Sequence, residues 1–326
     1  MTITKFARPQ PQQVMIGMVY LLLAWTFANI YDYVLPHNLD VTVEQLTTFT
    51  ARRPMQLRVL MPAIIHVVSV ATSLRIDTVN KLTTIVELWA ILLLFGRFLS
   101  FFVSQSRAWI AAPLILVPLF WNYCLLCYMH FSSDLAGIAL FLALLILRHE
   151  RKWVAWYVLF AMACFNRETI LFALPCLMAL WWRERSLRSW LTLAIASATI
   201  WIAVRVFLNY LFRDSPGGPF ENHLAFNLGS LEHAWTSNQG VVRYFIFLFG
   251  GMHIVSFALW KWTPRALRSL LLVSLLFWAV MLPVGILLES RIFGELIPIY
   301  CASTIVAMSV LFRTDVAMSP EPLISG

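Results

Sequence analysis

Long apolar runs alternate with short polar segments along most of this chain. Residues 14–30, 82–102 and 270–288 are among the runs that are poor in charge. A helix needs about 20 consecutive apolar residues to cross a bilayer. We therefore predict an all-α protein, a polytopic transmembrane helical bundle of about ten crossings plus a re-entrant hairpin, in which some helices are short and broken. Residues 1–326 then form a single transmembrane domain.

The composition supports this prediction. Of the 326 residues, 60% are hydrophobic and 12% are charged, and the mean hydropathy is +0.77. The formal net charge is +8, but the basic residues are spread between the apolar runs, so we expect no nucleic acid partner. The five cysteines lie inside apolar runs, which indicates small apolar side chains and no disulfide framework. Cys124 and Cys127 lack further ligands at suitable spacing, so a structural role is favoured over a metal site.

Lysine and arginine set the expected orientation, because they accumulate on the cytoplasmic side of a membrane. Lys5 and Arg8 precede the first apolar run, so we interpret that run as a signal anchor with its N-terminus inside. Asp32 then emerges outside, and Arg75 and Lys81 mark an inside turn. The prediction is a multi-pass protein of the bacterial inner (cytoplasmic) membrane with both termini cytoplasmic. Acidic residues, which do not enter this assignment, fall mostly on the outer side.

One segment breaks this alternation. Residues 109–130 are long enough to cross, yet 134–147 must run from outside to inside to bring the basic residues that follow it to the cytoplasm. Either 109–130 is a re-entrant hairpin broken around Pro113 and Pro118, or an earlier apolar stretch does not cross. We favour the re-entrant hairpin, because 75–81 makes a reasonable inside turn.

Residues 153–182 form the expected site hairpin. Two apolar arms of roughly a dozen residues each, shorter than a full span, flank residues 165–169. Basic clusters before and after the arms place both ends inside, so Arg167 and Glu168 occupy the outer-facing tip at membrane depth. Ionisable groups at that depth are costly and usually functional. The hairpin is therefore predicted to hold a site that faces outward.

Two polar segments, 31–57 and 208–240, are predicted to be outer loops. The first allows one interfacial helix, and the second is long and rich in Gly and Pro, which suggests a function beyond connection. Two histidines of the second loop match no standard zinc spacing, so no metal site is predicted, while a divalent cation held by carboxylate oxygens stays open. Arg205 and Arg243 border this loop and are expected to snorkel outward.

The outer elements place carboxylates and arginines at similar depth. Carboxylates there can act as a general base, and arginines can hold a phosphate bidentately. The candidate catalytic residues are Asp32, Asp40 and Glu168, and the candidate substrate-binding residues are Arg58, Asp134, Arg167, Glu289 and Arg291. The alternative is structural: the charged pairs at the hairpin tip and the last turn satisfy one another, and Asp134 caps its helix together with Ser132 and Ser133.

This layout resembles the GT-C superfamily of integral membrane glycosyltransferases that use polyprenyl-phosphate sugars. The resemblance rests on an acidic residue after the first span, short broken helices, two large outer loops, and segments 57–62, 166–169 and 289–291. It implies that an aspartate of the first outer loop, Asp32 or less well Asp40, is the catalytic base. It also implies that the lipid phosphate is bound by arginines, for which the matching positions are Arg58, Arg167 and Arg291. The first loop has no paired-acid motif and no soluble outer domain follows the membrane part, which are two departures from the family pattern.

The expected function is transfer of a sugar from a polyprenyl-phosphate carrier to an acceptor on the extracytoplasmic face. The expected partners are the lipid-linked sugar or polyprenyl phosphate, membrane lipid, and further membrane proteins. Two alternatives stay open. One is a transporter or flippase of lipid-linked or anionic solutes, whose broken helices shape a midplane site, although the sequence shows no internal inverted repeat. The other is a non-catalytic membrane subunit of a larger complex, whose charges form only structural pairs.

Overall fold

The protein is helical throughout the part of the chain that the structure describes. The computed structural model describes residues 11–34, 41–126, 131–182, 186–218, 221–236 and 239–312. The α-helices are α1 (Pro11–Val34), α2 (Val43–Thr47), α3 (Leu60–Thr72), α4 (Ile76–Leu99), α5 (Gln105–Ala111), α6 (Leu116–Phe120), α7 (Ser132–His149), α8 (Trp153–Cys164), α9 (Ala173–Trp181), α10 (Leu187–Leu211), α11 (Leu224–Thr236), α12 (Gln239–Phe247), α13 (Met252–Ala258), α14 (Arg265–Val284) and α15 (Ile297–Leu311). The 3₁₀ turns that matter for the site are η1 (Met55–Leu57), η4 (Glu168–Phe172) and η8 (Ser290–Leu296).

Within the described ranges, 6 helical segments are long and apolar enough to cross a membrane. They are Pro11–Val34, Ile76–Leu99, Gln105–Leu125, Leu187–Leu211, Arg265–Val284 and Ser290–Leu311. The shorter apolar helices are Leu60–Thr72, Trp153–Cys164, Glu168–Trp181 and Val242–Ala258. The described part of the chain is thus all-helical, as predicted. Its long apolar helices indicate a membrane protein, with six candidate spans where the sequence predicts about ten crossings.

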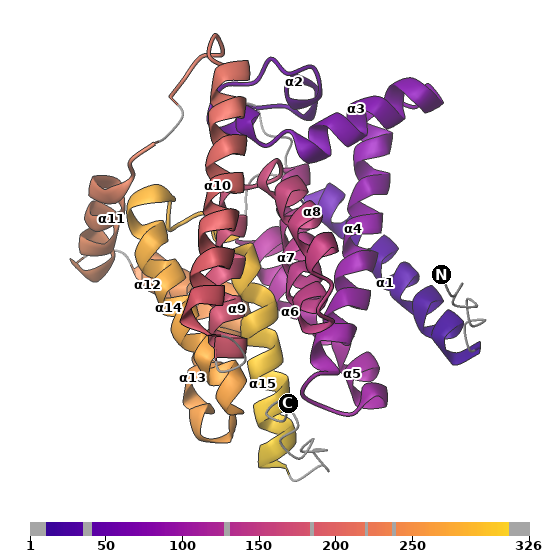
Figure 1. The fold of residues 1–326 in the computed structure, drawn as a ribbon, viewed down its shortest axis with the longest axis vertical. Helices are drawn as coiled ribbons and strands as arrows, with labels where there is room; N and C mark the ends of the chain where they lie inside the picture. Colours follow the sequence, from indigo (N-terminus) through magenta and orange to yellow (C-terminus); the bar gives the residue numbers. More distant parts are fainter. Residues whose placement is uncertain are drawn as a thin grey trace.

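α7 runs through the middle of the bundle and contributes much of its core. Ile138, Phe141, Leu142 and Leu145 are each 0% exposed, as expected of a helix that is apolar on every side and surrounded by protein. α4 and α8 pack along it, and η8 lies against its first turns. Figure 1 shows α1 and α4 on one side of this centre and α10 with α12 to α14 on the other. The first turn of α7, which holds Asp134, therefore lies inside the protein.

Residues 153–182, where the sequence predicts a site hairpin, fold as two short helical arms joined at residues 165–167. α8 forms the first arm, and η4 with α9 forms the second. Between the arms Arg167 has an extended backbone (φ −151°, ψ 147°), which turns the chain back. The carbonyl oxygen of Phe165 accepts hydrogen bonds from the backbone N–H groups of Val59 and Leu60 at 2.9 and 3.1 Å. These bonds fix the tip of the hairpin against the start of α3.

The first helices correct the expected topology. Lys81 Nζ, near the start of α4, donates to Asp32 Oδ2 of α1 at 3.1 Å. The two residues therefore lie on the same side, whereas the sequence placed Asp32 outside and the 75–81 turn inside. At the other end of α4, Arg97 Nη2 lies 3.3 Å from Glu150 Oε1, which follows α7. α3 has only 13 residues and is too short to add the expected crossing.

Residues 105–125 form one helical run in place of the expected re-entrant hairpin. The run combines α5, a 3₁₀ turn (Ala112–Ile115), α6 and a π-helical turn (Trp121–Leu125). Pro113 sits at the start of the 3₁₀ turn, a position that suits its fixed φ, and the helix continues past Pro118. A run that can cross here, together with a short α3, restores the alternation of the helices that follow. This is the alternative that the sequence left open.

The two predicted outer loops, 31–57 and 208–240, contain helices and touch each other. α2 lies in the first loop, and α11 lies in the second. The backbone N–H of Arg53 donates to the carbonyl oxygen of Pro216 at 2.8 Å. Beside this contact Gly217 has a φ of +89°, and a Cβ at this position would collide with the Arg53 carbonyl oxygen. The turn that joins the loops therefore requires glycine.

Candidate functional site

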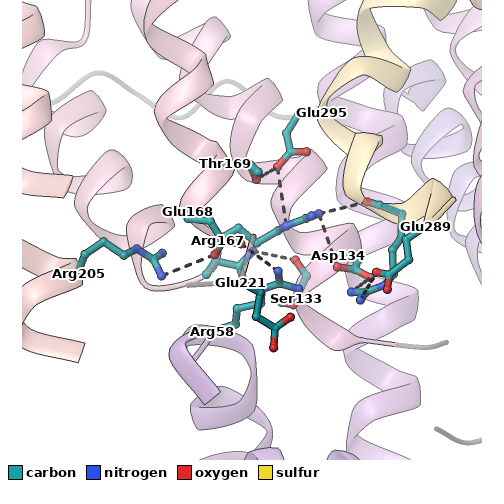
Figure 2. Close-up of polar contacts among 12 residues, drawn as sticks. Arg58, Ser133, Asp134, Arg167, Glu168, Thr169, Arg205, Glu221, Glu289 and Glu295 are labelled. Carbon is teal, nitrogen blue, oxygen red and sulfur yellow. Dashed lines mark hydrogen bonds and ion pairs between the residues drawn. The ribbon is translucent and has the colours of Figure 1, made fainter. Parts of the chain in front are cut away.

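In the described part of the chain, charged side chains from several distant segments meet in one network (Figure 2). Its members are four arginines and four carboxylates: Arg58, Asp134, Arg167, Glu168, Arg205, Glu289, Arg291 and Glu295. The network has two parts. We call one part the inner cluster, which consists of Asp134, Arg167, Glu289, Arg291 and Glu295. We call the other the arginine clamp, which consists of Arg58, Glu168 and Arg205.

Asp134 is the centre of the inner cluster. Its side chain is 0% exposed, and its two oxygens face different arginines. Oδ1 lies 3.5 Å from Arg167 Nη1, and Oδ2 lies 3.6 Å from Arg291 Nη1. The helix begins after Phe131 without a side-chain capping bond, and neither Asp134 oxygen accepts a hydrogen bond. The alternative in which Asp134 caps its own helix is therefore wrong, and the carboxylate faces the arginines instead.

The segment around η8 supplies the other inner carboxylates. Glu289 Oε2 accepts a hydrogen bond from Arg291 Nη2 at 2.7 Å. Glu295 Oε1 lies 3.9 Å from Arg167 Nε. The predicted structural pair at the last turn thus forms, whereas Arg167 and Glu168 at the hairpin tip make their ion pairs with other elements.

Hydrogen bonds to neighbouring segments hold the inner cluster in place. Asn122, in the π-helical turn, donates from Nδ2 to the carbonyl oxygen of Ser290 at 3.2 Å and accepts at Oδ1 from the backbone N–H of Phe249 at 2.7 Å. Ser290 Oγ donates back to the Asn122 carbonyl oxygen at 2.5 Å. On the hairpin side, Thr169 Oγ1 donates to Glu295 Oε1 at 2.5 Å. π-helical turns are frequent at functional sites, and this one fixes the start of η8.

The arginine clamp forms the more exposed edge of the network. Arg58 Nη2 donates to Glu168 Oε1 at 2.9 Å, and Arg205 Nη1 lies 3.6 Å from Glu168 Oε2. Arg205 Nη2 also donates to the carbonyl oxygen of Cys164, the last residue of α8, at 2.5 Å. The Glu168 side chain is 34% exposed, against 10% for Arg58 and 11% for Arg205. Figure 2 shows Glu168 between the two arginines.

Arg205 is the member of the clamp that the sequence analysis missed. It was expected to snorkel toward water, but α10 turns it inward to Glu168 and the end of α8. The available signal was its position within an apolar run, because an arginine at membrane depth needs a partner inside the protein. The run itself does not say which helix supplies that partner.

Both arginines of the clamp have N–H donors that are not used in hydrogen bonds. Arg58 Nε and Nη1 and Arg205 Nε are buried and have no hydrogen-bond acceptor. Buried polar groups are normally satisfied, so each such atom calls for an explanation such as a bound water or ion. A guanidinium offers five N–H donors in a planar fork that fits phosphate oxygens. The clamp can therefore bind an oxyanion with more than two oxygens.

The two other predicted catalytic residues do not join the network in the described structure. Asp32 is exposed, at 48% of its side chain, and pairs with Lys81. Asp40 lies outside the described residues. The structure thus brings Arg58, Asp134, Arg167, Glu168, Glu289 and Arg291 together and leaves Asp32 apart.

Among the residues with described positions, no group of three or more His, Cys, Asp or Glu side chains could hold a metal ion. Each carboxylate of the network faces an arginine. Glu221, which Figure 2 also labels, belongs to the loop after α10 and lies 3.3 Å from His223 Nε2. The donors that remain in the network are cationic, so its chemistry suits an anion.

Comparisons with protein-family models, with curated proteins and with solved structures gave no match. The resemblance to GT-C glycosyltransferases therefore stays an expectation from the sequence.

Proposed function

We propose that this protein is an integral membrane glycosyltransferase of the GT-C type. It would move a sugar from a polyprenyl-phosphate carrier to an acceptor on the extracytoplasmic face of the bacterial inner membrane. The observation that carries this proposal is the arginine clamp, in which two buried guanidinium groups keep unsatisfied donors inside an apolar bundle. Such donors match the oxygens of a phosphate ester, and an apolar bundle gives access to a lipid that carries one.

The proposed reaction assigns a distinct task to each part of the network. An acceptor hydroxyl attacks the anomeric carbon of the sugar, and the bond between that carbon and the phosphate oxygen breaks. The bonding electron pair leaves with the phosphate, whose negative charge Arg58 and Arg205 stabilise. The inner cluster does not touch the reacting atoms, and its role is to hold the hairpin tip and η8 in position.

The base that accepts the hydroxyl proton is Glu168 in this proposal. It is the most exposed carboxylate of the network, and it lies directly beside the arginines that would hold the phosphate. The resemblance implies Asp32 for this role. The ion pair of Asp32 with Lys81, away from the clamp, favours Glu168.

Specific observations also favour the two alternatives. The interrupted helices at η4 and η8 meet at the network, and broken helices that shape a buried site are typical of transporters. The ion pairs of the inner cluster are closed on one another, as a purely structural core would be. Unsatisfied buried polar atoms occur in both parts of the network, for example Arg167 Nε and both Asp134 oxygens in the inner cluster. The exposure of the Glu168 side chain, 34% against 0% for Asp134, is what sets the clamp apart from a purely structural cluster.

The test uses the full chain in nanodiscs with lipid-linked sugars extracted from bacterial membranes. The expected result is release of free polyprenyl phosphate together with a glycosylated acceptor. Replacing Arg205 with Gln should abolish release. Arg97→Gln is the matched control, because Arg97 also pairs with a glutamate, Glu150, but lies in the last turn of α4, outside the network.

The same preparation separates the proposed function from its alternatives. Movement of lipid-linked sugar across vesicles without cleavage of the sugar–phosphate bond would identify a flippase and contradict the transferase. Neither cleavage nor movement, with a chain that is stable only beside a partner protein, would indicate a structural subunit.

A further inference from the structure

The two parts of the network carry opposite formal charges. The clamp has two arginines against one carboxylate, a formal charge of +1, whereas the inner cluster has two arginines against three carboxylates, a formal charge of −1. Water reaches the clamp more readily than the inner cluster, because the Glu168 side chain is 34% exposed, whereas the inner carboxylates Asp134, Glu295 and Glu289 are 0%, 1% and 11% exposed. An anion that approaches the network is therefore attracted to its accessible part and repelled by the part that is sealed.

Glu168 lies in the clamp as a bridging anion would. Each of its two oxygens contacts one arginine, at 2.9 Å for Arg58 and 3.6 Å for Arg205. This arrangement leaves Arg58 Nε, Arg58 Nη1 and Arg205 Nε without acceptors. Two charged oxygens of a phosphate monoester can bridge the same arginines, and its third can accept from one of the remaining donors. A phosphate therefore satisfies the clamp more completely than Glu168 does.

The Glu168 side chain is also the carboxylate that can leave most easily. Its backbone is held, because Trp201 Nε1 donates to its carbonyl oxygen at 3.1 Å. Its carboxylate is partly in water already, so rotation toward solvent exchanges the arginine contacts for hydration. Asp134 and Glu295, at 0% and 1% exposure, have no such path.

We propose that Glu168 occupies the phosphate position between Arg58 and Arg205 until a phosphate ester displaces it. The identity of the ester as a polyprenyl-phosphate carrier rests on the proposed function. The anion site itself rests on the clamp geometry. Displacement moves the carboxylate away from both arginines, so a base appears beside the carrier only after the carrier is bound.

Glu168→Gln tests this proposal, because glutamine has the same size but no charge with which to compete. The probe is geranyl phosphate, a soluble short-chain polyprenyl phosphate, and its affinity for the full chain in nanodiscs is measured by calorimetry. If Glu168 fills about nine-tenths of the sites at rest, the variant binds about tenfold more tightly than the wild type. Adding Arg205→Gln to this variant should remove the gain.

Glu150→Gln is the matched control. Glu150 also bridges two basic groups, Arg97 at 3.3 Å and Lys152 at 2.6 Å, but it lies outside the network. Its replacement should leave the affinity for geranyl phosphate unchanged. Equal affinity for inorganic phosphate would identify a free anion as the ligand, whereas much tighter geranyl phosphate would identify a lipid carrier. Geraniol controls for partition of the chain alone.

A Glu168→Gln variant that folds like the wild type and binds geranyl phosphate no more tightly overturns the proposal. If this variant does not fold, Glu168→Asp takes its place, because its shorter carboxylate cannot bridge both arginines and should also raise affinity. No gain in that variant overturns the proposal equally. Tight phosphate binding without sugar transfer would instead contradict the transferase and leave the anion site standing.

Discussion

The inner cluster and the arginine clamp both consist of arginines and carboxylates, but the two parts differ in their exposure to water. In the inner cluster the Asp134, Arg167 and Glu295 side chains are 0–1% exposed. In the clamp, the Glu168 side chain is 34% exposed. An ion pair sealed from water cannot exchange partners without leaving a bare charge, whereas one at the edge can. Burial therefore separates a structural ion pair from one that a ligand can replace.

The two parts are joined by consecutive residues at the hairpin tip. Arg167 points into the inner cluster, and Glu168 points into the clamp. The backbone changes from an extended conformation at Arg167 to the 3₁₀ turn that begins at Glu168, so the two side chains leave the tip in different directions. The ion pairs of Arg167 anchor the tip of the hairpin, and this anchoring positions Glu168 in the clamp.

Arg167→Gln has the largest expected effect and tests whether the inner cluster is structural. It leaves Asp134 and Glu295 in the buried cluster without that arginine, and removal of one partner from a buried pair costs about 3–5 kcal/mol. We expect low yield and a strongly reduced melting temperature in detergent. Arg97→Gln, which breaks an exposed pair, should change the melting temperature little. Near-wild-type stability of Arg167→Gln would contradict a structural role for the inner cluster.

Asn122→Ala tests whether the inner cluster depends on the π-helical turn. The substitution removes the acceptor of the buried Phe249 N–H and a donor to the Ser290 carbonyl, at a cost of about 1–3 kcal/mol. Unfolding in denaturant with the detergent held constant gives the measurement. Asn209→Ala is the control, because Asn209 donates within its own helix to the Arg205 carbonyl. An equal loss in both variants would show that Asn122 has no special role.

Arg205→Gln should separate stability from binding. The clamp loses one arginine, but Arg58 still holds Glu168, so we expect a loss of stability of only about 1–2 kcal/mol. The affinity for geranyl phosphate should fall about tenfold or more, because a charge-assisted contact to the phosphate is lost. Melting temperature and calorimetry on one preparation give both values. A variant that loses stability but keeps its affinity would place the anion elsewhere.

The sequence predicted the hairpin tip and most of the network for a physical reason. Charged residues within short apolar arms are costly, so Arg167 and Glu168 were expected to meet partners, and residues of opposite charge occur in other segments that were predicted to be outer. The partners of each residue could not be predicted, because they depend on how helices pack. Arg205 illustrates this limit, because the apolar sequence around it is compatible with a side chain that faces lipid and with one that faces protein.

Topology failed for a related reason. Basic residues predict sides only after the crossings are known. The structure makes α3 a 13-residue helix and 105–125 one helical run, where the sequence predicted a crossing and a re-entrant hairpin. The pair between Asp32 and Lys81 shows the error directly, because a basic residue assigned inside contacts an acidic residue assigned outside. In the structure α3 has only 13 residues, fewer than the roughly 20 that a crossing needs. Of the first helices, α3 is therefore the one that fits a crossing least well.

Glu150 gives the smallest expected effect, because its partners Arg97 and Lys152 are 46% and 61% exposed. A hydrogen bond from Lys152 and the nearby charge of Arg97 hold its pKa below the ordinary value of 4.5, despite an opposing effect of burial. A carboxylate with a lowered folded-state pKa adds stability above its unfolded pKa and loses it as the pH falls through the folded value. Water screens these pairs, so Glu150→Gln should cost only about 0.5 kcal/mol at pH 7.

The difference between wild type and Glu150→Gln should vanish in acid, once the wild-type carboxylate is protonated, and melting temperatures across a pH series would show it. A difference that persists in acid would mean that Glu150 acts through packing instead of charge. If Glu150→Gln lowered the free energy of unfolding at pH 7 as much as Arg167→Gln does, burial would not determine how much an ion pair stabilises this bundle. In that case the exposure of Glu168 could no longer explain why the clamp exchanges its anion while the inner cluster stays closed.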